Sequence, residues 1–137
     1  MRTVLFAACL LVSGCASGPR QAPLSAPRAL LDEEFTLALG DSIALEGTPY
    51  SIAFRDVIED SRCAQGTICI WEGNARIELE FRESAGRKFT WHLDTSSRIP
   101  TEKYDTGFAM ELRRLDPQPR EGVKTGGYNA TLVARKK

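Results

Sequence analysis

Two neighbouring stretches in the middle of the chain alternate apolar and polar residues with a period of two. Residues 75–82 have an apolar side chain at every odd position, and residues 88–94 do the same from Phe89 onward. Because successive side chains of a β-strand point to opposite faces, each stretch would have one dry face and one wet face. The pattern is therefore typical of two half-buried strands and not of helices.

The same two stretches predict how they pair. The residues between them include Gly86, which can adopt a positive φ and close a hairpin turn. In an antiparallel pair of strands 75–82 and 87–94, Glu78 would face His92 and Arg76 would face Asp94, so that opposite charges meet. On the buried face we expect Ile77, Leu79, Phe81, Phe89, Trp91 and Leu93. On the exposed face we expect Glu78, Glu80, Lys88 and His92.

Shorter alternating segments flank this hairpin on both sides. They cover residues 35–39, 43–45, 50–54, 108–112 and 128–133, and segments rich in Gly, Pro and Asp separate most of them. The alternation slips near Asp56, because Val57 and Ile58 are both apolar, and this indicates a β-bulge. No segment longer than a turn has a helical period. The chain is therefore predicted to be all-β, a single antiparallel β-sandwich or small barrel of about seven or eight short strands.

The first fifteen residues have the features of an export signal. Arg2 precedes a short apolar run at residues 4–12, which is shorter than the roughly 20 residues that a membrane-spanning helix needs. The segment Val12-Ser13-Gly14-Cys15 is similar to the processing site of bacterial lipoproteins. That resemblance implies that residues 1–14 are a lipoprotein signal peptide and that Cys15 is lipidated after cleavage. Several acyl chains on one residue would form a durable membrane anchor.

The next residues are expected to link this anchor to the folded domain. Residues 15–31 contain three prolines and few large apolar side chains, so we expect a lipidated, Pro-rich tether there and the all-β domain at 32–137. Resemblance to Gram-negative lipoproteins in which residues such as Ala16 and Ser17 follow the lipidated Cys implies a periplasm-facing location on the outer membrane. The chain has 18 basic and 18 acidic residues, and this balance disfavours nucleic acid as a partner. We expect a monomer whose partners are the membrane, through its lipid, and an envelope protein.

Two cysteines remain once Cys9 leaves with the signal and Cys15 carries lipid. In an oxidising compartment the remaining pair, Cys63 and Cys69, indicates a disulfide that closes a loop of seven residues. The surrounding segment, 60–75, resembles a family of small bacterial lipoproteins and secreted proteins with an Asp-Ser-Arg-Cys and Cys-x-Trp-x-Gly-x-Ala signature. The resemblance extends over about residues 35–133 and implies no particular activity. This chain has Ala64 and Glu72 where members usually have Pro and Ala.

Four interpretations of this segment are open. It is a structural staple, a recognition loop with Arg62, Trp71 and Glu72 as contacts, a metal site that combines both thiolates with Asp60 or His92, or a redox pair. Zinc sites favour cysteines two to four residues apart and redox pairs favour Cys-x-x-Cys, so the observed spacing favours the first two interpretations. We therefore expect no metal and no other cofactor.

The sequence also contains one segment that suggests catalysis. Gly40-Asp41-Ser42-Ile43 resembles the first block of GDSL-type esterases, and that resemblance would make Ser42 a nucleophile. A nucleophilic Ser needs a base, and the only histidine, His92, is predicted on the wet face of a distant strand. The carboxylates at 56, 59, 60, 78 and 80 are interleaved with arginines, which is typical of a solvated charge ladder.

We therefore expect a protein that is not an enzyme, and that acts as a non-catalytic binding or envelope-structural module. One alternative is an inhibitor of an exported hydrolase, by resemblance to lysozyme-inhibitor lipoproteins, which are also small all-β domains. The other alternative is a hydrolase that depends on Ser42.

Overall fold

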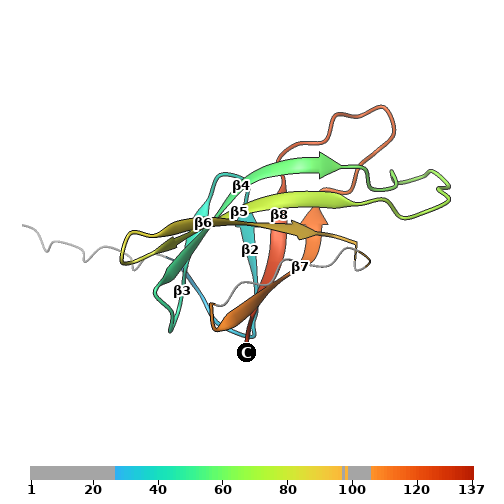
Figure 1. The fold of residues 1–137 in the computed structure, drawn as a ribbon. Coiled ribbons are helices and arrows are strands. Elements are labelled where there is room, and N and C mark those ends of the chain that lie inside the picture. Colours follow the sequence, from blue (N-terminus) through green and yellow to red (C-terminus); the bar gives the residue numbers. More distant parts are fainter. Residues whose placement is uncertain (1–26, 97, 99–105) are drawn as a thin grey trace, which may run out of the picture.

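The regular structure of the protein is entirely β in the computed structural model, which describes residues 27–96, 98 and 106–137. Within these ranges the strands are β1 (Arg28–Ala29), β2 (Glu34–Ala38), β3 (Ser42–Leu45), β4 (Tyr50–Asp60), β5 (Ala75–Glu83), β6 (Lys88–Asp94), β7 (Phe108–Asp116) and β8 (Asn129–Lys136). They form a five-stranded sheet in the order β1-β3-β4-β5-β6 and a three-stranded sheet in the order β2-β8-β7 (Figure 1). The all-β prediction is confirmed, and the two open sheets make the arrangement sandwich-like and not a closed barrel. A search of the described residues for a helix long and apolar enough to span a membrane finds none.

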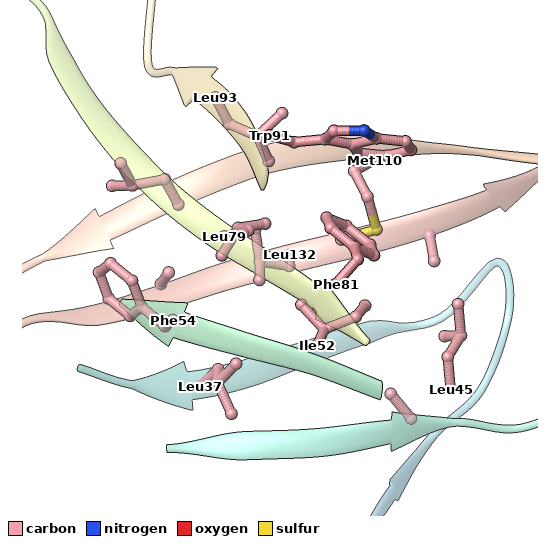
Figure 2. Packing of buried hydrophobic residues seen from close by; sticks show 14 of the residues in the cluster. Leu37, Leu45, Ile52, Phe54, Leu79, Phe81, Trp91, Leu93, Met110 and Leu132 are labelled. Atoms are coloured by element: carbon pink, nitrogen blue, oxygen red, sulfur yellow. The ribbon is translucent and has the colours of Figure 1, made fainter. Parts of the chain in front are cut away.

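One hydrophobic core lies between the two sheets. Figure 2 shows side chains from the larger sheet, such as Ile52 and Phe81, on the side that faces Leu37 and Leu132 of the smaller sheet. The ring centroids of Phe81 and Trp91 are 4.4 Å apart, and the ring centroid of Phe108 in β7 lies 5.7 Å from that of Trp91. Full burial of each such side chain stabilises the fold by about 1.5 to 3 kcal/mol, so this aromatic cluster joins the sheets.

The β5–β6 hairpin forms as the alternation predicts. Glu78 lies opposite His92 and Arg76 lies opposite Asp94, and Gly86 in the turn has a φ of 96°. Ile77, Leu79, Phe81, Trp91 and Leu93 are buried as expected. The period of two therefore predicts both the pairing and the face that enters the core.

The solvent face of this hairpin is less exposed than we expect from the sequence. Glu78, Glu80 and His92 are half-buried, while Phe89 on the opposite face is only partly buried. The reason is that long side chains cross the sheet surface, as when Arg55 Nη2 donates a hydrogen bond to Glu80 Oε1 over 2.7 Å. Lys88 is exposed as predicted.

The segments before the hairpin pair in ways that their local pattern does not show. β2 and β3 follow each other in sequence, but β2 pairs with β8 and β3 pairs with β4, so the Gly40 turn carries the chain from one sheet to the other. Leu39, which the alternation places inward, is exposed because β2 ends at Ala38. The bulge expected near Asp56 is confirmed, since the β4–β5 register shifts between Phe54 and Asp56.

The folded domain begins earlier than the predicted boundary at residue 32. Arg28 and Ala29 form β1, which pairs in parallel with Ala44 and Leu45 of β3, and Ala29 is buried in the core. The last residues assigned to the tether, 28–31, therefore belong to the domain. A two-residue strand is too short to show a period, so its parallel pairing cannot be read from local sequence. The predicted signal peptide, Cys15 and the tether up to residue 26 lie outside the described residues.

Candidate interaction site

A loop at residues 61–74 connects β4 to β5 and contains the predicted cysteine pair. Cys63 and Cys69 are joined by a disulfide, with their Cα atoms 6.0 Å apart. Because the two sulfurs are bonded to each other, neither is a thiolate available to a metal in this state. A disulfide is compatible with the staple, the recognition loop and the oxidised form of a redox pair.

The two ends of the loop are drawn together into a narrow base. The backbone N–H of Ser61 donates to Asn74 O over 2.7 Å, and the N–H of Cys63 donates to Glu72 O over 2.9 Å. Gly73 has a φ of 75°, and a Cβ added there would lie 2.0 Å from Ser61 O. Only glycine fits this close approach, which explains the Gly of the sequence signature.

Arg62 holds the base of the loop against the second sheet. Its Nε and Nη2 atoms donate to the two carboxylate oxygens of Asp60, each over 2.7 Å, in a bidentate ion pair. The guanidinium also donates to the carbonyl oxygens of Leu115 and, over 2.9 Å, of Pro117. Tyr128 completes the network by donating its hydroxyl to Asp60 Oδ2 over 3.1 Å. We refer to Asp60, Arg62 and Tyr128 as the latch.

The latch is enclosed, and its ionisation reflects this. The side chains of Arg62 and Asp60 are only 7% and 10% exposed. Burial by itself would raise the pKa of Asp60, but the hydrogen bonds and charge of Arg62, together with the Tyr128 hydroxyl, outweigh it and hold that pKa below its ordinary value. Burial, followed by the hydrogen bond to the Asp60 carboxylate, raises the pKa of Tyr128. At neutral pH the latch is therefore a charged pair with a neutral phenol.

The tip of the loop has the opposite character. Ile68 and Ile70 are fully exposed, and Trp71 is 52% exposed. Figure 1 shows the loop between β4 and β5 extending beyond the end of the larger sheet, at the same end of the molecule as the loop between β7 and β8. We refer to Ile68, Ile70 and Trp71 as the apolar tip.

A second loop, at residues 117–128, supports the first. The Gln65 N–H donates to Pro119 O over 2.8 Å, and Gln65 forms an isolated parallel bridge with Arg120. A groove of about 480 Å³ is formed mainly by the second loop, and Gln65 of the first loop contributes to its lining. Its lining residues include Gln65, Gln118, Arg120, Val123 and Lys124.

The structure places the three predicted contact residues in different environments. Arg62 is enclosed in the latch and bonded to groups of the fold, which does not favour its predicted role as a contact. Trp71 belongs to the apolar tip, and the exposed Glu72 accepts a hydrogen bond from Ser96 Oγ over 3.3 Å. Ile68 and Ile70 are the residues that our sequence reasoning missed. The available signal was three large apolar side chains in a row of four positions, one inside the disulfide-closed residues 63–69 and two directly after them.

The residues considered for catalysis are not brought together. Ser42 lies opposite Ala53, which is opposite Glu80, and Glu80 is opposite Thr90 on β6. His92 is therefore three strands from Ser42, a separation of roughly 14 Å at about 4.8 Å per strand. Its Nε2 atom lies 3.4 Å from Glu78 Oε2 instead. Ser42 thus has no histidine base within hydrogen-bond reach.

Glu80 lines a groove on the outer face of the larger sheet with Ser42, but it is a weak base. The hydrogen bond from Arg55 is the largest influence on Glu80 and lowers its pKa below the ordinary value. A carboxylate stabilised in its charged form has little tendency to take up the proton of a serine hydroxyl. Glu80 is the only carboxylate among the residues that line this groove, and Arg55 stabilises its charged form.

Searches of protein-family models, curated proteins and solved structures found no match to this chain.

Proposed function

We propose that this chain is an outer-membrane-anchored lipoprotein and a non-catalytic binding module that contacts a partner protein through its apolar tip. The observation that carries the proposal is the full exposure of Ile68 and Ile70 beside a half-exposed Trp71. Each large apolar side chain left in water forgoes about 1.5 to 3 kcal/mol of burial, and nothing in the fold requires these residues at these positions. Contiguous exposed apolar side chains, with an aromatic among them, are typical of protein interfaces.

The loop is held in a manner that suits recognition. The disulfide closes residues 63–69 of the loop, directly before Ile70 and Trp71, and the latch fixes the base of the loop to the carbonyl oxygens of Leu115 and Pro117. A loop that is already ordered loses less conformational entropy when it binds. The rigid base therefore favours a binding role for a tip whose composition does not serve the fold.

The position of the tip also favours a partner other than the anchoring membrane. The described chain starts beside β3, where Ala44 N–H donates to Pro27 O, and Ala44 pairs with Ser51 near the start of β4. The loop leaves the far end of β4, after Asp60. Nine residues of extended strand separate these points by roughly 30 Å at about 3.3 Å per residue. The described domain thus begins at the end opposite the apolar tip, which is the end that a lipidated tether would join.

Inhibition of an exported hydrolase is a second candidate function. The observation that favours it is the protrusion of a stapled loop with an apolar end, a shape that can enter a concave site (Figure 1). An inhibitor of this kind would form a stable stoichiometric complex, and the captured protein would be a hydrolase.

Photo-crosslinking in native envelopes tests the binding role. A photoreactive phenylalanine at position 70 should capture one discrete protein, because that side chain would lie in the interface. The same group at Ala85, in the exposed hairpin turn at the other end of β5, is the matched control and should capture little. In a chain that also carries Ile68→Ser and Trp71→Ser, the capture at position 70 should disappear. Equal capture at positions 70 and 85, or none at either, would contradict the proposal.

The anchor is tested separately. Cys15→Ser should release the protein from the outer-membrane fraction, and mass spectrometry of the unaltered protein should show acyl chains on residue 15. An unmodified Cys15 with normal fractionation would rule out the lipoprotein assignment and leave the binding role to be judged by the crosslinking.

A further inference from the structure

The groove beside the apolar tip has a chemical character of its own. Arg120 and Lys124 line it, both are exposed, and neither is paired with a carboxylate among the described residues. The acidic residue in the lining, Asp116, is already engaged, because Arg114 Nε donates to its Oδ2 over 2.6 Å. The groove lining therefore contains two basic residues that form no ion pair among the described residues and one acidic residue that does.

The same groove offers neutral groups that suit a peptide. The side-chain amides of Gln65 and Gln118 line it and have no hydrogen-bond partner among the described residues. Val123 adds an exposed apolar surface. Amides that both donate and accept can bind the backbone of an extended segment, and an exposed valine can contact an apolar side chain within it.

The groove is also preformed. The hydrogen bond from Gln65 N–H to Pro119 O joins the first loop to the second, and Val123 N–H donates to Arg120 O over 3.2 Å within the second loop. Arg62 donates a hydrogen bond to Pro117 O, and the Tyr128 hydroxyl connects the end of the second loop to Asp60 by another hydrogen bond. The latch thus fixes both loops, which carry the apolar tip and the groove at the same end of the molecule (Figure 1).

We propose that this groove binds an acidic, extended segment of the partner protein, with Arg120 and Lys124 contacting its carboxylates while the apolar tip contacts an adjoining hydrophobic patch. This inference rests on the proposed function and names the chemistry of the partner. Exposed charge pairs add modest affinity, but they steer association and disfavour partners of the wrong charge. The cations therefore supply selectivity, and the apolar tip supplies most of the contact area.

A protein segment fits this surface better than an anionic membrane. The groove lining contains two basic residues, whereas segments that recognise anionic membranes typically cluster about four to eight Lys and Arg residues. The end of the domain that would carry the lipid anchor also lies away from the tip.

The test uses the full chain, purified in detergent, and a display library of random twelve-residue peptides as the probe. Selected peptides should contain more Asp and Glu than Lys and Arg. A synthetic copy of an enriched peptide should bind the variant R120E/K124E at least tenfold more weakly than the unaltered chain. The matched control is R28E/K88E, which reverses two exposed charges remote from the groove and should change the affinity less than twofold. The milder variant R120Q/K124Q, expected to weaken binding in the same direction, guards against misfolding of the double reversal.

Each other outcome has a definite meaning. Selection of peptides without an acidic excess, recovery of no peptide, or unchanged binding by R120E/K124E would overturn the inference, and crosslinking at position 70 would still decide the proposed function. If the photoreactive group at position 70 captured no protein in a chain without other substitutions, the proposed function would be contradicted. Binding to vesicles that contain phosphatidylglycerol, weakened by R120E/K124E, would mean that the basic groove recognises a lipid surface and would also overturn the inference.

Discussion

The β5–β6 hairpin and the loop that precedes it distribute polar and apolar side chains in opposite ways. In the hairpin, large apolar residues such as Leu79 and Trp91 are buried, and the charged residues lie on the solvent side. In the loop, the ion pair of Asp60 and Arg62 is enclosed while Ile70 is fully exposed. The two regions are contiguous in sequence, so the difference cannot come from compartment, solvent or overall composition.

This contrast separates residues that serve the fold from residues that do not. The hairpin follows the hydrophobic effect, since every large side chain on its inner face is removed from water at least in part. The latch also serves the fold, because it joins β4 to the end of β7 through Leu115 and Pro117. The apolar tip neither enters the hydrophobic core nor joins the two sheets, and an exposed apolar cluster without a structural role indicates an interaction surface.

Truncation of the hairpin core should produce the largest effect. Leu79→Ala should lower the free energy of unfolding by about 2 to 5 kcal/mol, because it removes a fully buried side chain and leaves a cavity. The neighbouring Glu80→Ala should cost less than about 1 kcal/mol, since its ion pairs with Arg55 and Arg82 are partly exposed. Urea denaturation measures both. Equal costs would mean that the hairpin does not have one dry and one wet face.

Removal of the latch arginine should come next. Arg62→Ala should cost about 2 to 4 kcal/mol, because it leaves the enclosed Asp60 carboxylate without its partner. Arg114→Ala is the matched control, since Arg114 also pairs with an Asp two residues away but is largely exposed, and it should cost less than about 1 kcal/mol. If thermal and urea unfolding gave the two variants similar stabilities, the enclosure of the latch would have no energetic consequence.

Loss of the disulfide should have a smaller effect. Replacing both Cys63 and Cys69 with Ser should lower the free energy of unfolding by about 2 kcal/mol, since the bridge closes a short loop. A reductant should destabilise the unaltered protein to the same extent and leave the double variant unchanged. Reductant sensitivity that persisted in the double variant would assign the effect to another group.

Acidification should affect the latch and spare the hairpin core. The pKa of Asp60 is lower in the folded chain than in the unfolded one, so its stabilising contribution is complete above about pH 4, the usual range for Asp, and is lost as the pH falls through the folded value. The stability difference between the unaltered protein and Asp60→Asn should therefore be largest near neutral pH and shrink below pH 4. Urea titrations at a series of pH values measure this difference. A constant difference across that range would show that the Asp60 carboxylate is not stabilised by Arg62.

A polar substitution in the apolar tip should have the smallest effect on stability. Ile70→Ser should change the free energy of unfolding by no more than about 0.5 kcal/mol, because the side chain is already in water. Ile77→Ser, the same change at a fully buried position of β5, should cost about 3 kcal/mol or more. Thermal unfolding compares the two. A marked loss of stability in Ile70→Ser would mean that the tip contacts the fold and is not reserved for a partner.

Local sequence predicts those parts of the protein in which neighbouring residues determine each other's environment. The alternation in residues 75–94 predicts both strands, their register and their buried face, since a strand repeats every two residues and a short turn aligns its partner. The pairing of Cys63 with Cys69 is predictable for the same reason, because only six positions separate them. The lipid anchor at Cys15 and the absence of catalysis stay predictions from sequence.

Only the tertiary structure decides the contacts that join distant segments. Arg62 meets the Leu115 carbonyl across 53 positions, and Tyr128 meets Asp60 across 68, so neither contact leaves a local pattern. For that reason the sequence suggests that Arg62 is a surface contact, whereas in the fold it belongs to the latch. The exposure of Ile68 and Ile70 is decided in the same way, since a residue is buried only if another element covers it, and the two sheets complete their core without them.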